Sequence, residues 1–143
     1  MSDPPPSETV HASCVAAGGR AVLILGASGA GKSALALELM ALGARLVADD
    51  RTILSLEDEG LVARAPEPIR GRIEARFVGI LRADALASAP LALAVDLDRA
   101  ETERLPPHRR ARFLDREVPL LRRVDRPYFP AAILTHLISG RSD

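Results

Sequence analysis

The stretch Gly26-Ala27-Ser28-Gly29-Ala30-Gly31-Lys32-Ser33 matches the phosphate-binding loop pattern G-x-x-x-x-G-K-[ST] at every fixed position. The apolar run of residues 21–25 before it predicts a buried strand, and the run of strong helix formers at residues 34–42 after it predicts a helix. In this context the N–H groups of the loop bind phosphate oxygens, the Lys32 side chain reaches the β- and γ-phosphates, and the Ser33 hydroxyl ligates Mg²⁺. The sequence therefore predicts a binding site for a nucleoside triphosphate and Mg²⁺.

The composition indicates one domain that does not bind nucleic acid. A chain of 143 residues is long enough for one hydrophobic core and too short for a second full domain. Its 19 basic and 19 acidic residues cancel, so no net positive field attracts a polyanion. With three Phe, one Tyr and no Trp, the chain also has few side chains on which bases could stack.

Cysteine content and hydropathy restrict the environment of the protein. The single cysteine, Cys14, excludes an internal disulfide and a cysteine-rich zinc site. No apolar run approaches the ~20 residues of a transmembrane helix, and no basic start leads into an apolar signal core. We therefore expect a cytoplasmic protein that has no membrane partner.

The segments before the loop predict a mixed sheet. Residues 1–9, with three consecutive prolines, predict a disordered tail, so we expect the domain to span residues 10–143. Residues 10–15 predict a strand, and Gly18-Gly19 predicts the turn of an antiparallel hairpin that leads into the strand before the loop. An all-parallel nucleotide fold begins directly with the loop strand, so the expected fold class is α/β with a mixed sheet.

After the loop helix, the chain alternates apolar runs with charged turns. We expect a strand ending at Asp49-Asp50, a hairpin across residues 57–60, and a charged, solvated loop with some helical turns at residues 99–116. The other expected elements are an extended segment at residues 73–81, strands at 45–48, 91–97 and 118–124, and a C-terminal helix at 131–139.

Phosphoryl transfer requires a carboxylate that orients or deprotonates the acceptor, and two candidates follow apolar strands. Asp49-Asp50 ends the strand at residues 45–48. A right-handed crossover would place that strand beside residues 21–25, with the aspartates near the phosphates. Asp96 also lies at the end of an apolar run. The crossover geometry favours the Asp49-Asp50 pair, although adjacent aspartates outside such a context ordinarily form a surface turn.

His11, the loop, the helix ALALELMALG and the segment RLVADDR together resemble the catalytic domain of HPr kinase/phosphorylase, which phosphorylates a serine of the phosphocarrier protein HPr. The similarity continues more weakly to the end of the chain. The resemblance implies a P-loop domain with a sheet like that of phosphoenolpyruvate carboxykinase, the cofactors ATP and Mg²⁺, an HPr-like carrier protein as partner, and a homo-oligomer. Only about ten residues precede His11, so we expect a short form that consists of the catalytic domain alone.

The resemblance also implies roles for individual residues. His11 matches a histidine that opens the domain, and Lys32 and Ser33 match the loop lysine and serine. Asp49-Asp50 matches an aspartate pair whose second member accepts the proton of the substrate serine. The resemblance therefore makes Asp50 the general base.

Two further motifs supply a metal ligand and an arginine. The family signature E-I-R-G-L-G-I corresponds to residues 74–80, so the resemblance makes Glu74 a Mg²⁺ ligand together with Ser33. Phe77 stands where the family has a glycine. A family arginine in a D/E-R-L-G context corresponds to Arg104, which would bind the charge that develops in the transition state.

One family segment has no counterpart, and two other functions stay open. The segment P-V-x-x-G-R-N, which the family uses for dephosphorylation, is not matched in residues 122–130, so we expect little of the reverse reaction.

Without the resemblance, His11 is more typical of a strand edge than of a catalytic site. The loop and the carboxylates by themselves equally permit a small-molecule kinase. A nucleotide-sensing module without turnover is disfavoured, because binding alone does not require a base.

Overall fold

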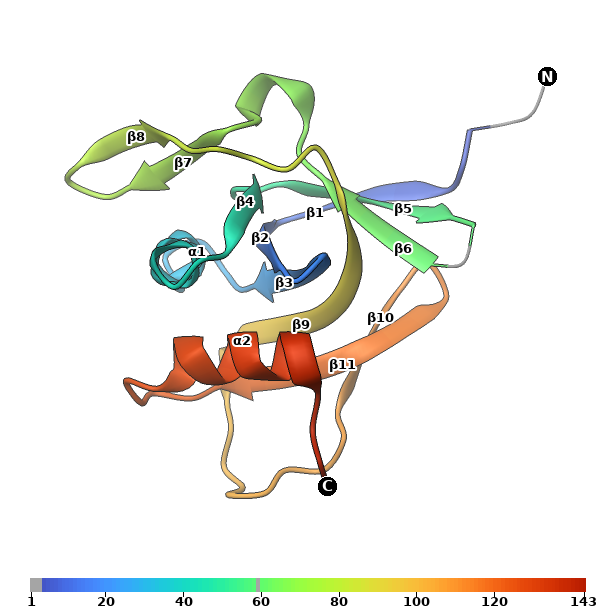
Figure 1. Cartoon of the computed structure of the whole chain (residues 1–143), viewed down its shortest axis with the longest axis vertical. Helices are drawn as coiled ribbons and strands as arrows, with labels where there is room; N and C mark the ends of the chain where they lie inside the picture. The colour runs from blue at the N-terminus through green and yellow to red at the C-terminus, as the bar shows by residue number, and fades with distance from the viewer. Residues whose placement is uncertain (1–3, 59) are drawn as a thin grey trace.

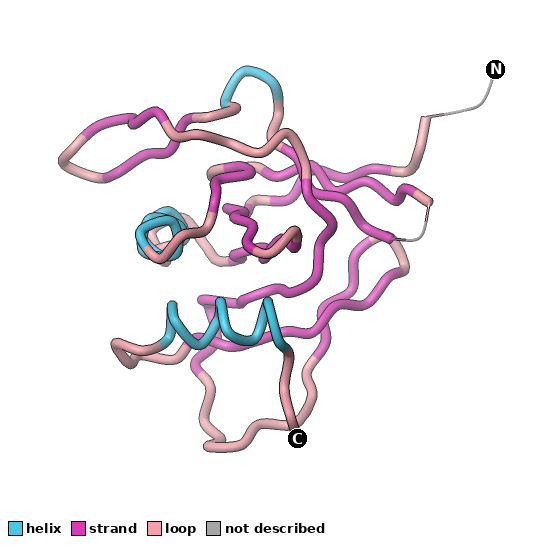
Figure 2. Tube along the Cα trace, in the orientation of Figure 1, coloured by secondary structure: helices cyan, strands magenta, loops and turns pink. Residues whose placement is uncertain are grey.

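The computed structural model describes residues 4–58 and 60–143 and confirms an α/β fold built on a curled, mixed sheet (Figures 1 and 2). The helices are α1 (Lys32–Ala41) and α2 (Phe129–Ser139), and a short 3-10 turn is η1 (Glu67–Ile69). The strands are β1 (Ser7–Val10), β2 (Ala12–Ala17), β3 (Arg20–Leu25), β4 (Arg45–Ala48), β5 (Thr52–Glu57), β6 (Gly60–Arg64), β7 (Arg72–Ala75), β8 (Gly79–Arg82), β9 (Ala89–Ala100), β10 (Arg110–Phe113) and β11 (Arg116–Arg123).

The loop strand β3 lies inside the main sheet, whose order is β1-β5-β6-β9-β3-β2-β4, with β11 also paired to β9. It pairs antiparallel with β2 and parallel with β9. Gly18 and Gly19, between β2 and β3, have φ values of 60° and 75°. Two positive φ values are what a type I′ turn requires in a two-residue hairpin. The predicted hairpin before the loop and the predicted mixed sheet are therefore confirmed.

The prediction that β4 lies beside β3 is wrong. Strand β4 pairs with β2 and not with β3, because β2 and β9 already occupy the two edges of β3. The connection through α1 therefore passes over β2. Both β3 and β4 are antiparallel to β2, so they run parallel to each other. The C-terminal end of β4 therefore lies at the same end of the sheet as the start of the loop.

Strand β3 places its side chains in two hydrophobic clusters. Val22 and Ile24 belong to the cluster that includes Leu39 of α1 and Ile133 of α2. Leu23 belongs to the cluster on the other side, which β5, β6 and β11 help to form. All five side chains are fully buried or nearly so. A strand covered on both faces is apolar throughout, and it gives the phosphate loop a rigid support.

The sheet takes in part of the predicted tail. Residues Ser7–Val10 form β1, which pairs antiparallel with β5, so the boundary expected at residue 10 lies too late. Residues 1–3, also assigned to the tail, lie outside the described residues. The single strand expected at residues 10–15 is interrupted by a bend at His11. A polar segment can form an edge strand when a neighbouring strand offers free backbone groups, which local composition does not reveal.

The charged region at residues 99–116 is also more regular than expected. Strand β9 continues to Ala100, and β10 pairs antiparallel with β11, so the predicted helical turns are wrong. Ala111 and Phe113 of β10 pack against the core between exposed arginines, which gives the alternation of a half-buried strand. Residues 73–81 are the hairpin β7–β8, which turns at Phe77 with a φ of 67°.

Candidate active site

The loop between β3 and α1 has a conformation that its glycines permit. Gly29 and Gly31 have φ values of 86° and 102°, a region that residues with side chains rarely adopt. Gly31 is the N-cap of α1, so Lys32 and Ser33 are the first two residues of the helix. The first N–H groups of a helix lack intrahelical partners and carry partial positive charge, so this end of α1 suits phosphate oxygens.

The Lys32 side chain crosses the loop. Its Nζ atom donates hydrogen bonds to the carbonyl oxygens of Gly26, at 2.6 Å, and Ala27, at 3.2 Å. Lys32 is buried and lines the pocket above the loop. Its positive charge is therefore held against the loop, at the wall of the pocket.

Strand β9 contacts the loop from the other side. The Asp98 carboxylate accepts hydrogen bonds from the Ala27 N–H, with N···O distances of 3.0 and 3.2 Å. Asp96, the alternative candidate for the base, pairs in register with Leu25 and accepts a 2.8 Å hydrogen bond from the Asp98 N–H. These two aspartates therefore hold the start of the loop, and neither lines the pocket above it.

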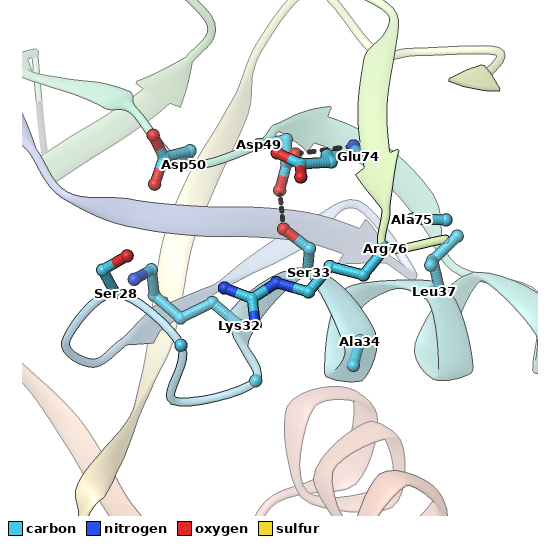
Figure 3. Close-up of a pocket in the computed structure, with 12 residues that line it drawn as sticks. Ser28, Lys32, Ser33, Ala34, Leu37, Asp49, Asp50, Glu74, Ala75 and Arg76 are labelled. Atoms are coloured by element: carbon cyan, nitrogen blue, oxygen red, sulfur yellow. Dashed lines mark hydrogen bonds between the residues drawn. The ribbon is translucent and has the colours of Figure 1, made fainter. Parts of the chain in front are cut away.

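Asp49 joins three elements of the fold. Its Oδ1 atom accepts hydrogen bonds from the hydroxyls of Ser33, at 2.6 Å, and Ser13, at 2.8 Å. Its Oδ2 atom accepts a 3.0 Å hydrogen bond from the Glu74 N–H. Figure 3 shows the contacts to Ser33 and Glu74. Asp49 is buried, so these three donors replace the water that a buried carboxylate would lose.

Asp50 follows in a different conformation. Its φ is 64°, which places it in the left-handed region. Its N–H donates to the Ser13 hydroxyl oxygen at 3.2 Å, and its carbonyl oxygen accepts a 3.1 Å hydrogen bond from the Ala12 N–H. Asp50 is exposed and lines the pocket, and Figure 3 shows its carboxylate well apart from that of Asp49. The two adjacent aspartates therefore occupy different environments.

The loop, the aspartate pair and the β7–β8 hairpin enclose a pocket of about 460 Å³. The lining residues are Ser28, Gly29, Gly31, Lys32, Ser33, Ala34, Leu37, Asp49, Asp50, Glu74, Ala75 and Arg76. Glu74 enters from the end of β7. The Arg76 guanidinium extends over the loop and lies close to Gly29. Its Nη2 atom is 3.9 Å from the position that a Cβ atom on Gly29 would occupy. The pocket therefore brings together Lys32, Ser33, both aspartates and Glu74 from distant parts of the chain.

Two expected site residues lie elsewhere. His11 is exposed at the bend between β1 and β2, and it precedes Ala12, whose N–H bonds to Asp50. It is beside the aspartate turn but does not line the pocket. Arg104 lies on the loop between β9 and β10, where it lines a second pocket of about 740 Å³ with residues from β11 and α2. The structure does not bring Arg104 to the phosphate loop.

The loop that carries Arg104 is fixed by an ion pair. Arg109 donates from Nε to Glu101 Oε1 and from Nη2 to Glu101 Oε2, both at 3.0 Å. This hydrogen-bonded pair lowers the pKa of Glu101 to about 2. Bidentate pairs of this kind are strong, so the connection between β9 and β10 is held close to the end of β9.

Three residues of the site were not expected from the sequence. Ser13 contacts the aspartate pair because β2 pairs with β4, and Asp98 contacts the loop because β9 pairs with β3. No motif indicates either residue. Arg76 was visible as a matched position of the E-I-R-G-L-G-I signature, and that match was the signal that could have identified it.

The oxygen donors of the pocket fit a magnesium ion bound together with phosphate. Mg²⁺ in phosphoryl-transfer sites takes one or two carboxylates, substrate phosphates and water. Ser33, Asp49 and Glu74 offer such hard oxygen donors. Within residues 4–58 and 60–143, no three His, Cys, Asp or Glu side chains are arranged to hold a metal ion by themselves.

Neither helix in this part of the chain is long and apolar enough to cross a membrane.

Comparison with known protein families and sequences gives a consistent result. Residues 5–102 match the family model described as HPr Serine kinase C-terminal domain. The HPr kinase/phosphorylase of Peptoclostridium acidaminophilum is 51% identical over 77 residues, which are 53% of this chain and 25% of that protein. The HPr kinase/phosphorylase of Geobacillus kaustophilus (strain HTA426) is 37% identical over 145 residues, covering 92% of this chain and 47% of that protein. The chain therefore spans about half the length of that relative.

A solved structure shares the fold. The HPr(Ser) kinase/phosphatase from Coxiella burnetii aligns with a TM-score of 0.74 and 24% sequence identity, over 92% of this chain and 87% of that chain. At this level of identity the likeness is one of fold. It supports the arrangement of the mixed sheet around the phosphate loop.

Proposed function

The chain belongs to the HPr Serine kinase C-terminal domain family, and from this premise we propose that it is an ATP- and Mg²⁺-dependent kinase. Its substrate in this proposal is a serine of HPr or of a related small phosphocarrier protein. The observation that carries the proposal is that Ser33, the buried Asp49 and the exposed Asp50 line one pocket above a phosphate loop. That pocket combines a phosphate site with a carboxylate that is free to meet an acceptor.

The residues of the loop bind the nucleotide in this proposal. The N–H groups at the start of α1 hold phosphate oxygens, and Lys32 neutralises charge on the β- and γ-phosphates. Arg76 reaches the loop from the β7–β8 hairpin and can contact the same phosphates. Positioned positive charge of this kind stabilises a transition state in which charge spreads over the transferred group.

Ser33, Asp49 and Glu74 would hold the magnesium ion. When bound, Mg²⁺ neutralises phosphate charge and orients the γ-phosphoryl group. The 2.6 Å hydrogen bond between Ser33 and Asp49 shows that the hydroxyl and the buried carboxylate already meet at one point. Glu74 lines the same pocket, with an exposed side chain.

Asp50 is the proposed general base. Its carboxylate accepts the proton of the substrate serine while the serine oxygen forms a bond to the γ-phosphorus atom and the bond to the β–γ bridging oxygen breaks. The products are phosphoserine and ADP. Asp50 suits this role because it is exposed to an incoming protein, whereas all three hydrogen bonds to the Asp49 carboxylate come from within the fold. His11 lies beside the same turn and is proposed to contact the acceptor. Arg104 would bind transition-state charge only if its loop moved to the pocket above the phosphate loop.

The test is direct phosphorylation of purified carriers. The full chain is incubated with ATP, Mg²⁺ and candidate HPr-type proteins, and mass spectrometry locates any phosphate. We expect a single phosphoserine on a carrier, and none with the Asp50→Asn variant. Transfer to metabolites in place of a protein would support a small-molecule kinase, and bound ATP without any transfer would support a sensor.

A phosphocarrier substrate implies a cytoplasmic location, and light scattering would test the homo-oligomer that the family resemblance implies.

A further inference from the structure

We propose that Ser13 is a positioning residue that holds the Asp49-Asp50 pair in its working geometry, an inference that rests on the proposed function. Ser13 lies on β2 and is fully buried. Its hydroxyl donates a hydrogen bond to Asp49 Oδ1 at 2.8 Å and accepts one from the Asp50 N–H at 3.2 Å. A single oxygen atom therefore contacts both aspartates.

The position of Ser13 on β2 makes this contact possible. Its neighbours Ala12 and Cys14 point into the cluster opposite α1, whereas Val15 packs in the cluster that α1 covers. By the alternation of a strand, Ser13 faces the same side as Val15 and α1. A hydroxyl there is buried and needs partners, and the end of β4 supplies a carboxylate and an N–H group. Only a group that donates and accepts at once satisfies both, and a hydroxyl does so.

The contact also supports an uncommon backbone conformation. Asp50 has a φ of 64°, in a region that few residues with a side chain adopt. Two backbone hydrogen bonds hold the turn, from Ala12 N–H to Asp50 O at 3.1 Å and from Arg51 N–H to Asp49 O at 2.7 Å. Ser13 adds a side-chain contact to the N–H of Asp50 itself. A substitution at Ser13 leaves the two backbone bonds in place and removes the side-chain one.

The geometry predicts what the loss of this hydroxyl does. Asp49 keeps Ser33 and Glu74 as donors but loses the donor that comes from β2. Asp50 loses the bond that fixes its N–H, so its carboxylate is no longer held at one distance from the γ-phosphate. Loss of a residue that orients catalytic ligands costs roughly 10- to 100-fold in activity. The nucleotide contacts of the loop do not involve Ser13, so nucleotide binding is expected to change little.

Substitutions of matched shape separate the effect of the Ser13 hydroxyl from the effect of side-chain volume. Ser13→Thr and Ser13→Val add equal bulk, but only threonine retains a hydroxyl. Ser13→Ala removes the hydroxyl without adding bulk. Cys14→Ala is the matched control, because it removes one heavy atom from the next residue of β2, in the opposite cluster. We expect kcat for carrier phosphorylation to fall roughly 10- to 100-fold in the Ala and Val variants, with the affinity for ATP changed less than about threefold. The Thr variant and Cys14→Ala should stay near the native rate.

Amide hydrogen exchange tests the same contact without a carrier protein. The Asp50 N–H should exchange about fivefold faster, or more, in Ser13→Ala and Ser13→Val than in Ser13→Thr, with the Ala12 N–H as internal reference. Equal exchange in all variants, or equal kcat for Val and Thr, would overturn the inference. If the Thr and Val variants do not fold, the comparison of Ser13→Ala with Cys14→Ala decides. If the native protein phosphorylates no carrier, the proposed function fails, and the exchange rates still decide whether Ser13 holds Asp50.

Discussion

The Nζ atom of Lys32 lies 2.6 Å from the carbonyl oxygen of Gly26, so the lysine at the start of α1 is hydrogen-bonded to the first residue of the phosphate-binding loop. Its second bond, to Ala27, lies at 3.2 Å. Hydrogen bonds that involve a charged donor are stronger than neutral ones. The lysine therefore shapes the loop as well as supplying charge to it.

Lys32→Ala should lower phosphoryl transfer by roughly 10²-fold or more, because one preorganised charge on the phosphates is worth about 3 kcal/mol of transition-state stabilisation. Lys32→Met is the control for packing, since it keeps a long side chain without the charge. Steady-state kinetics with ATP and a carrier measure the effect, and circular dichroism checks the fold. Native turnover in either folded variant would remove Lys32 from the mechanism.

Asp50→Asn should abolish transfer while nucleotide still binds, because an amide cannot accept the proton of the serine. Loss of a general base typically costs 10²- to 10⁴-fold in rate. Asp96→Asn should do much less, because Asp96 holds the Asp98 N–H through Oδ1, and asparagine keeps that acceptor. Transfer assays and nucleotide titrations on both variants check this. If Asp96→Asn is the inactive variant, the base has been assigned wrongly.

The forward reaction should be faster than the reverse by about tenfold or more, since even one lost hydrogen bond to phosphate costs about 1.5 kcal/mol. The segment at residues 122–130 contains Pro127 and Pro130, which have no N–H to donate. Arg123 in that segment is already bonded to Leu97 O at 2.7 Å and paired with Asp125 at 3.2 Å. The segment lines the second pocket and not the pocket above the loop.

The measurement for the reverse reaction is loss of phosphate from a serine-phosphorylated carrier, or release of pyrophosphate, in excess inorganic phosphate. A reverse rate equal to the forward rate would contradict the expectation. In that case Arg122→Ala and Arg126→Ala would test whether these arginines bind the phosphate in place of the missing family segment.

The Glu101–Arg109 pair should make a pH-dependent contribution to stability. The hydrogen bond from Arg109 lowers the pKa of Glu101 from 4.5 to about 2. Because the folded-state pKa is the lower one, the stabilisation is complete above about pH 4.5 and is lost as the pH falls towards 2. The difference in unfolding free energy between the native chain and Glu101→Gln should therefore shrink below pH 4.5.

Carboxyl NMR titration of Glu101 provides an independent measurement of the same pair. In the Arg109→Leu variant the pKa of Glu101 should rise towards its ordinary value. An unshifted Glu101 in the native chain would mean that the two hydrogen bonds of 3.0 Å do not persist in solution.

Local patterns in the sequence determined the strand β3, the glycine-rich loop after it and the helix α1. The glycine spacing, the apolar run before it and the helix formers after it lie within about 20 residues, and such local signals act through backbone conformation. The Gly18-Gly19 hairpin, and with it the mixed sheet, was predictable for the same reason. The Asp49-Asp50 pair was correctly placed at the end of a strand, although the strand was given the wrong neighbour.

Only the tertiary structure decided which strands are neighbours, and the rest of the site follows from that. Strand β2 lies between β3 and β4 and brings Ser13 to both aspartates, while β9 brings Asp98 to Ala27. Arg104, chosen from a motif, lies on a loop that folds towards α2 and away from the phosphate loop. Pairing between strands depends on hydrogen bonds and packing between residues far apart in the chain, and neither periodicity nor a short motif carries that information.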